Sequence, residues 1–276
     1  MADTIDDVRT HYGATGLTGR LRSALMALGP EDSRLTPQQL APLDHFHTRG
    51  LAATAELAEL AGITADSAVL DVGSGIGGPA RFLAASYGCT VTGADLSPPF
   101  TEAARYLTER TGQTEQVSFE TASALELPFP TGAFDVALLQ HVAMNIEDRA
   151  GLYGEIFRVL KPGGRFATYD VVLAGGDPHY PVPWARTPAT SFLLSPQATR
   201  DAAEAAGFRT VVARDDSEAS RGWAAQMRAA GQPPGPNLGI VMGPDFAELA
   251  QNLGRNLLEG RLGILTAIFE ATPSDR

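Results

Sequence analysis

Apolar segments alternate regularly with more polar, Ala- and Glu-rich segments through most of the chain. Seven apolar segments are predicted to be strands: 68–73, 90–96, 117–122, 133–140, 165–172, 209–216 and 262–271. The segments predicted to be helices between them are 79–86, 98–111, 148–160 and 196–206. Strands that alternate with helices in this way predict an α/β fold with a doubly wound, mostly parallel seven-stranded sheet.

The two ends of the chain differ from this alternating middle. Thr36, Pro37 and Gln39 form a helix-start pattern, and the Ala/Leu-rich residues that follow predict a helix up to Gly62, weakly interrupted at Gly50. Residues 1–62 are therefore predicted to be a helical N-terminal segment or lid. We expect 63–173 to form the binding core.

The last third, residues 174–276, completes the predicted sheet but carries two inserted stretches. These are 174–195, which is rich in proline, and 217–260, which contains helical patterns at 219–230 and 244–259. Because open α/β sheets bind ligands at the carboxyl ends of their strands, we expect both insertions to form a cap over that edge.

A glycine-rich turn follows the first predicted strand. Gly73, Gly75 and Gly78 give the spacing G-x-G-x-x-G, which lets the backbone approach a ligand at a helix N-terminus. The spacing alone also matches dinucleotide sites. Asp71, two residues before the first glycine, favours a cationic amino group there and would repel a pyrophosphate. Asp95, at the end of the second strand, is placed to accept ribose hydroxyls, which suits any adenosine ligand.

Composition narrows the partners. The chain has 21 Lys and Arg against 32 Asp and Glu, a net charge of −11, and no basic run, so nucleic acid is not expected as a partner. No apolar run reaches the length of a signal peptide or membrane helix, and Cys89 is the only cysteine. A cytoplasmic enzyme is predicted, with no membrane insertion and with homo-oligomerisation left open.

Four blocks between 68 and 170 carry a resemblance to a known family. VLDVGSGIGGPARFLA, VTGADLS, TASALELPFPTGAFDVALLQHV and EIFRVLKPGGRFATYD occur in the order found in class I S-adenosylmethionine (SAM)-dependent methyltransferases. The segment LDHFHTRGLAATAELA resembles a small-molecule group of that family. This group includes sterol, tocopherol and quinone C-methyltransferases and sarcosine/dimethylglycine N-methyltransferases.

The resemblance implies a Rossmann-like fold, SAM as the cofactor and a role for each matching residue. Gly73, Gly75 and Asp71 would contact the methionine part of SAM, and Asp95 the ribose. Leu96, Ser123 and Ala124 would border the adenine. Many relatives have Asp where Ser123 stands, and a serine is a weaker acceptor. Gln140 would lie beneath the methionine, and Arg49 would pair with its carboxylate.

Methyl transfer needs an aligned acceptor, and a base only when the acceptor carries a proton at the reacting atom. His141, at the end of the fourth strand, and His45 are the catalytic candidates, although His45 and His47 cannot share one face of a helix. Tyr12, Tyr180 and Trp184 are candidate substrate contacts. No metal-ligand spacing occurs, so no metal is expected.

An apolar cap favours a small, largely apolar acceptor methylated at carbon or oxygen, such as an isoprenoid or secondary metabolite. Its predicted lining is Phe100, Trp184, Phe192, Leu193, Leu194, Trp223, Met227, Met242 and Phe246. Arg186, Arg221 and Arg228 leave open an acceptor that carries carboxylate or phosphate. N-methylation of a small amine, an NAD-dependent oxidoreductase and a non-catalytic SAM-binding protein are the alternatives.

Overall fold

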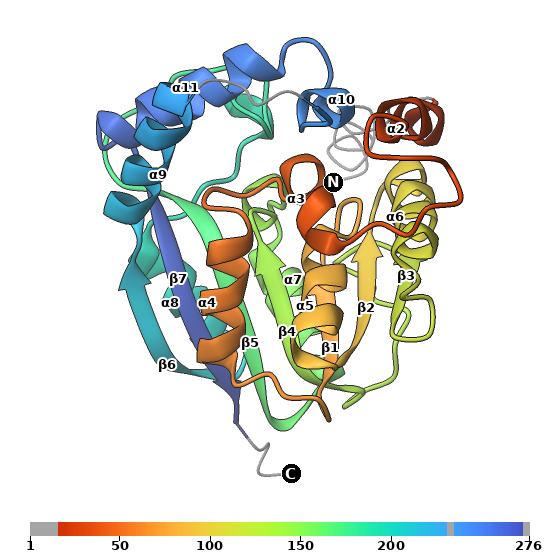
Figure 1. Ribbon diagram of the computed structural model, residues 1–276. Helices are drawn as coiled ribbons and strands as arrows, with labels where there is room; N and C mark the ends of the chain where they lie inside the picture. The colour runs from red at the N-terminus through yellow and green to blue at the C-terminus, as the bar shows by residue number, and fades with distance from the viewer. Residues whose placement is uncertain (1–15, 231–234, 273–276) are drawn as a thin grey trace.

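A single seven-stranded sheet forms the centre of the computed structural model, which describes residues 16–230 and 235–272 (Figure 1). The strand order is β3-β2-β1-β4-β5-β7-β6. Every pairing is parallel except those of β7, which runs antiparallel to β5 and β6. The strands are β1 (Ala68–Val72), β2 (Thr90–Asp95), β3 (Val117–Thr121), β4 (Phe134–Gln140), β5 (Leu160–Leu173), β6 (Phe208–Asp215) and β7 (Leu262–Ala271).

Helices cover both faces of this sheet, as the alternating sequence pattern predicts. The α-helices on the two faces are α4 (Leu51–Ala61), α5 (Gly78–Tyr87), α6 (Pro98–Thr111), α7 (Arg149–Val159) and α8 (Pro196–Ala205). Those above the carboxyl edge are α2 (Leu17–Leu25), α3 (Pro37–Asp44), α9 (Ser217–Ala230), α10 (Gly239–Met242) and α11 (Phe246–Leu258) (Figure 1). Short 3-10 helices span Ala143–Asn145 and Pro188–Thr190. The predicted doubly wound, mostly parallel sheet is confirmed.

Two apolar layers hold the helices to the sheet. One contains Leu57 of α4 and Leu83 of α5 packed on Val69 and Leu138. The other, on the opposite face, joins Ile156 of α7 to the sheet. Side chains buried this completely each contribute about 1.5–3 kcal/mol to folding. The central strands are therefore held rigidly, and the loops at their carboxyl ends start from fixed positions.

A third apolar cluster lies above the carboxyl edge of the sheet. Leu21 of α2, Leu43 of α3 and Val241 of α10 pack there with Ile76 and Phe100. Segments from both ends of the sequence thus meet in one roof over β1 and β2 (Figure 1). This arrangement agrees with the expected cap.

The N-terminal helical segment differs from the prediction. Thr36 caps α3 with Gln39 in the predicted capping box, but α3 ends at Asp44, and α4 begins only at Leu51. Two residues of the connecting loop, Arg49 (φ 64°) and Gly50 (φ 49°), have left-handed backbone angles. The single helix predicted from Thr36 to Gly62 is therefore wrong, because the backbone leaves helical angles at His45 and returns to them only at Leu51.

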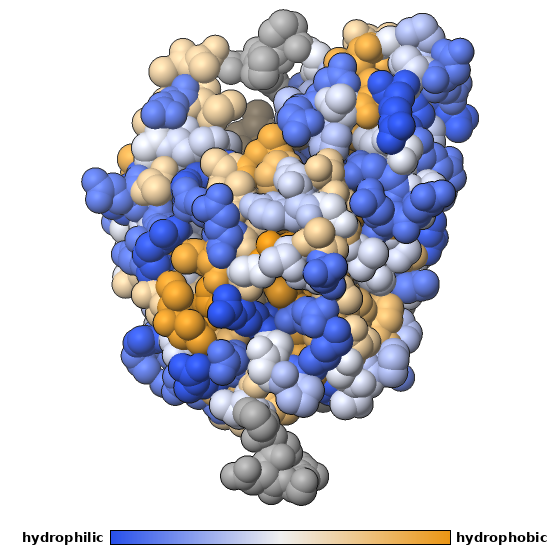
Figure 2. All heavy atoms as spheres, turned by 60° about the horizontal axis from the view of Figure 1, so that its bottom comes forward, coloured by the Kyte–Doolittle hydropathy of each residue, from blue (hydrophilic) through white to orange (hydrophobic). Residues whose placement is uncertain are grey.

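The outer surface is mixed in character. On the face shown in Figure 2, polar side chains surround and interrupt the apolar areas. Within residues 16–230 and 235–272, no helix combines the length and apolarity needed to cross a membrane.

Candidate active site

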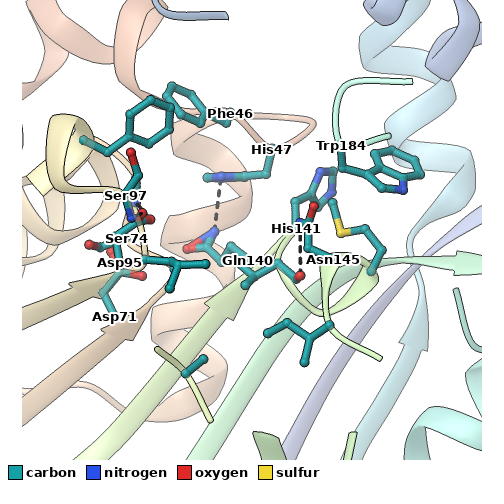
Figure 3. Close-up of a pocket in the computed structure, with 18 of the residues that line it drawn as sticks. Phe46, His47, Asp71, Ser74, Asp95, Ser97, Gln140, His141, Asn145 and Trp184 are labelled. Carbon is teal, nitrogen blue, oxygen red and sulfur yellow. Dashed lines mark hydrogen bonds between the residues drawn. The ribbon is translucent and has the colours of Figure 1, made fainter. Parts of the chain in front are cut away.

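A cavity opens at the carboxyl ends of β1, β2 and β4, below the roof (Figure 3). Its floor comes from the glycine-rich turn and from the first residues after β2 and β4. One wall is the loop between α3 and α4, and the opposite wall comes from the segments after β5 and β6. The strand ends therefore place side chains distant in sequence around one space.

The first two glycines of the turn have backbone angles that favour glycine. Gly73 has φ 72° and Gly75 has φ 54°. A Cβ on Gly73 would lie 2.4 Å from Val142, and one on Gly75 would lie 3.3 Å from Phe46. Both residues line the cavity, so the backbone itself forms this part of the floor.

The third glycine has a different role. A Cβ on Gly78, the first residue of α5, would lie 2.2 Å from the carbonyl oxygen of Asp44. Gly78 therefore allows close packing of α3 against the start of α5. Because Phe46 and His47 follow Asp44, this contact helps to position one wall of the cavity.

Asp71 is a buried carboxyl group with an unused acceptor. Its side chain lines the cavity, and its Oδ2 atom has no hydrogen-bond partner. Burial, reinforced by the nearby charge of Asp95, raises the pKa of Asp71 to about 7. A cationic group in the cavity would satisfy this oxygen and favour its ionised form.

Asp95 is held in place by the backbone. Its two oxygens accept hydrogen bonds from the N–H groups of Gly75 at 2.8 Å and Ser97 at 2.9 Å. Burial raises the pKa of Asp95 to about 6, although these two bonds oppose the increase. Each carboxylate oxygen keeps a second lone pair, so Asp95 can accept two further hydrogen bonds from a ligand.

Gln140 is held by His47, a residue that was not predicted to belong to the site. Its Nε2 lies 3.1 Å from His47 Nε2 and donates at 3.1 Å to Thr54 Oγ1 (Figure 3). His47 lines the cavity, and burial lowers its pKa well below the ordinary value, so its ring is neutral. The only sequence signal was its place two residues after His45.

His141 lies at the centre of the cavity wall. It adopts φ 54°, an uncommon angle for a residue other than glycine, while its N–H donates to the Tyr169 carbonyl at 2.9 Å. Its ring stacks on Tyr169 at 5.5 Å between centroids, and its Nε2 has no partner. Burial lowers the pKa of His141 to about 3, so the ring is neutral.

Most predicted site residues do meet at this cavity. Gly73, Gly75, Asp71 and Asp95 line it, and so do the residues Leu96, Ser123, Ala124, Gln140, His141 and Trp184. Their roles toward a ligand stay predictions. Tyr12 lies outside the described residues, and Tyr180 is absent from the lining and packs against the core.

Two predicted site residues are used elsewhere. His45 Nδ1 lies 2.8 Å from Asp44 Oδ1, and its ring lies outside the cavity lining because α3 ends at Asp44 and directs His47 inward instead. Arg49 pairs with Glu56 of α4 and lies outside the lining as well. Their placement gives no support to His45 as a catalytic group or to Arg49 as a carboxylate ligand.

The apolar wall is made partly of other residues than those predicted. Phe100, Trp184, Met242 and Phe246 line the cavity, joined by residues the prediction did not include: Phe46, Met144, Leu238 and Leu253. The other predicted lining residues, Phe192, Leu193, Leu194, Trp223 and Met227, lie outside it.

The central part of the chain matches a family of known domains. Residues 70–168, which include the glycine-rich turn, Asp95, Gln140 and His141, match the family described as methyltransferase domain. The chain carries a methyltransferase domain. The sterol 24-C-methyltransferase of Eremothecium gossypii is 39% identical over 117 residues, which are 42% of this chain and 31% of that protein. The chain thus spans less than a third of this relative's length.

Solved structures resemble the methyltransferase domain and its surroundings over most of the chain. The cyclase SpnF is 26% identical, with TM-score 0.66, and the match covers 93% of this chain and 92% of SpnF. Geranyl diphosphate C-methyltransferase from Streptomyces coelicolor has TM-score 0.71 at 18% identity, covering 98% of both chains. That structure contains Mg²⁺, a geranyl thiolodiphosphate and S-adenosylhomocysteine. At this identity it shows the shared class I fold.

Proposed function

We propose that the protein is a SAM-dependent methyltransferase that acts on a small, largely apolar acceptor at carbon or oxygen. The observation that supports this most directly is the pair of carboxyl groups in one cavity. Asp71 offers a buried oxygen without a partner, and Asp95 offers two oxygens fixed by backbone N–H groups. SAM carries a matching ammonium group and a matching ribose diol.

Asp71 also argues against a dinucleotide. A pyrophosphate on the glycine-rich turn would lie near the carboxyl group of Asp71, where burial makes repulsion between like charges costly. SAM brings two positive charges, the ammonium and the sulfonium, to this acidic surface. The NAD-dependent oxidoreductase alternative is therefore disfavoured by the site itself.

The remaining floor residues fit the adenine and methionine parts. Leu96 and Ala124 offer apolar contact to a ring, and the Ser123 hydroxyl accepts from the Leu125 N–H at 3.2 Å while it lines the cavity. Gln140, held by His47 and Thr54, would contact the methionine tail. When SAM is bound, its sulfonium supplies an activated methyl group.

This chain's own residues then have to align the acceptor and exclude water. The apolar wall, which includes Trp184 and Phe246, covers part of the cavity. His141 is neutral and has a free ring nitrogen, so it can bind an acceptor hydroxyl and receive its proton as the methyl transfers. N-methylation of a small amine remains the alternative within this class.

Cyclisation is a second candidate function, favoured by the likeness to SpnF over nearly the whole chain. An apolar cavity that excludes water would also suit a cycloaddition of a bound polyene. The product distinguishes the two candidate functions, because only methyl transfer converts SAM to S-adenosylhomocysteine.

The proposal also assigns a role to each part of the chain and a location to the protein. Residues 63–173 would bind the cofactor, 1–62 would form the lid, and 174–276 would supply the cap as well as the remaining strands. A single cysteine and a net charge of −11 suit a cytoplasmic protein that interacts with small molecules, and homo-oligomerisation is compatible with these features.

Calorimetry tests the proposed cofactor directly. We expect SAM and S-adenosylhomocysteine to bind and NADH to show no heat of binding. Asp95→Asn should weaken both adenosyl ligands because it removes one charged acceptor of the ribose, an interaction of about 1.5–3 kcal/mol. Binding of NADH without binding of SAM would refute the proposal.

A further inference from the structure

Resting on the proposed function, we propose that the cavity accepts an uncharged acceptor that carries a hydroxyl group and excludes acceptors that carry phosphate. The observation behind it is the charge of the lining. Among residues 16–230 and 235–272, no lysine or arginine lines the cavity. The charged residues that do are all acidic: Asp44, Asp71, Asp95, Glu147 and Asp148.

The arginines that could have received an anion are directed elsewhere. Arg186 forms an ion pair with Asp245 at 2.9 Å, and it lies outside the lining, as do Arg221 and Arg228. Arg149 is the partly buried arginine that follows the 141–148 loop. Its guanidinium donates to the backbone carbonyls of Ala143 and Phe192, so it braces this loop instead of facing the cavity.

A metal bridge offers the other way to hold a diphosphate on an acidic surface. A metal held mainly by the protein needs several ligands that converge on one point, and a Mg²⁺ ion that bridges to phosphates still needs one or two carboxylates free to bind it. Within the described part of the chain, no three His, Cys, Asp or Glu side chains converge in this way. Asp148 is also engaged locally, since its Oδ1 accepts from the Gly151 N–H at 2.8 Å as the cap of α7.

Two residues that line the cavity each carry a buried, uncharged polar atom without a partner. These atoms are His141 Nε2 and Asn145 Oδ1, and both belong to the loop that follows β4 (Figure 3). Asn145 Nδ2 donates to the Val142 carbonyl at 3.2 Å, which fixes the amide with its oxygen free. A hydroxyl group donates one hydrogen bond, so it can satisfy one of these two acceptors.

The surroundings of these two atoms are apolar. Trp184, Met242 and Phe246 form the opposite wall, and Trp184 keeps its own N–H occupied by donating to Ser191 Oγ at 2.9 Å. A phosphate in this space would lose its hydration without gaining a cation, which is costly. A neutral hydroxyl on an apolar body would lose little.

Matched pairs of ligands test the proposal. We suggest titrating geraniol against geranyl diphosphate and 1-naphthol against 1-naphthyl phosphate, with and without Mg²⁺. The titrations use the full chain with and without saturating S-adenosylhomocysteine. We expect each alcohol to bind at least about tenfold more tightly than its phosphate ester, with no change on adding Mg²⁺. Tighter or equal binding of the esters, or binding of neither member, would overturn the proposal.

Two variants of one lining residue test the charge argument separately. Glu147→Lys adds a cation at the cavity, and Glu147→Gln is its uncharged control. We expect Glu147→Lys, compared with Glu147→Gln, to raise the affinity for geranyl diphosphate several-fold relative to the affinity for geraniol. If the ratio of the two affinities in Glu147→Lys equals that in wild type, the acidic lining is not what excludes phosphate. The titrations without S-adenosylhomocysteine measure acceptor binding by itself. They therefore test this inference even if the protein does not bind SAM.

Discussion

The guanidinium of Arg81 lies 2.7 Å from the carboxylate of Asp44, and both side chains are almost fully buried. Arg81 belongs to α5, behind the glycine-rich turn, and Asp44 is the last residue of α3. The same guanidinium donates to the Ile76 carbonyl at 2.8 Å. One ion pair therefore joins the turn of the proposed SAM site to the loop that carries His47.

We expect removal of this ion pair to destabilise the protein strongly. Arg81→Met leaves the Asp44 carboxylate buried with fewer partners, at a cost of about 3–5 kcal/mol. Urea denaturation measures the loss in the free energy of unfolding. The control is Arg209→Met, which breaks the exposed pair with Glu270 and should cost less than about 1 kcal/mol. Equal losses in both variants would contradict the buried role of Arg81.

Gly78 should tolerate no side chain. Gly78→Ala places a Cβ 2.2 Å from the Asp44 carbonyl oxygen, so α3 and α5 must separate, and we expect a loss of about 1–3 kcal/mol. Gly154→Ala in α7 is the matched control, because nothing lies within 4 Å of its added Cβ. That change should stabilise the helix by about 0.5–1 kcal/mol. Thermal denaturation of both variants would show opposite shifts in Tm.

The affinity for SAM should increase with pH. The pKa of Asp71 is raised to about 7 by burial, and the SAM ammonium binds its ionised form, so binding releases a proton. Between pH 8 and pH 6 the ionised fraction falls about tenfold, and the affinity should fall with it. Calorimetry in buffers with different ionisation enthalpies measures both the affinity and the released proton.

Asp71→Asn separates the contribution of this carboxyl group. The variant should bind SAM about tenfold or more weakly at pH 8 and lose most of the pH dependence. Because the folded-state pKa lies above the ordinary 3.8, wild-type stability should fall as pH rises from about 4 through 7. The ligand-free variant should show a smaller fall, because Asp95 and Asp170, whose pKa values are each raised to about 6, still contribute to it, and it should have the higher Tm at pH 8. If the SAM affinity of the variant varies with pH as it does in the wild type, Asp71 does not bind the SAM ammonium.

Much of the fold follows from the sequence because strand and helix patterns are local. The seven strands, the capping box at Thr36 and the turn at Gly73 involve neighbours in the chain, so their residue types predict them. The same holds for Asp71 and Asp95. Each stands at the end of a parallel strand, and those ends necessarily meet at one edge of the sheet.

The errors arose where contacts across the fold determine the path of the chain. The residues from 43 to 61 favour one helix locally, yet the contact of Asp44 with Gly78 and Arg81 ends α3 and turns His47 inward. No local pattern distinguishes His45 from His47. Arg49, in the loop before α4, pairs with Glu56 of α4, seven residues later in the chain. Composition alone could not distinguish this partner from the carboxylate of a ligand.

His141 should act on the acceptor and leave the cofactor unaffected. Its backbone has φ 54°, so His141→Gly removes the imidazole and keeps a backbone angle that glycine adopts without strain. We expect this variant to bind S-adenosylhomocysteine within about twofold of wild type and to lose about a hundredfold or more in kcat/KM for the acceptor, because general acid–base catalysis typically contributes about 10²–10⁴-fold. His141→Ala should lose as much activity and, in addition, stability, because alanine is strained at this angle.

The pH profile adds a readout that a purely structural role would not produce. Burial lowers the pKa of His141 to about 3, so its own titration should leave no step in kcat/KM between pH 5 and 9. For a phenolic acceptor, wild-type activity should persist toward low pH, where neutral His141 can still receive the proton. His141→Gly should require the ionised phenol, and its activity should rise about tenfold per pH unit below the phenol's pKa. Parallel profiles in the two proteins would show that His141 takes no proton.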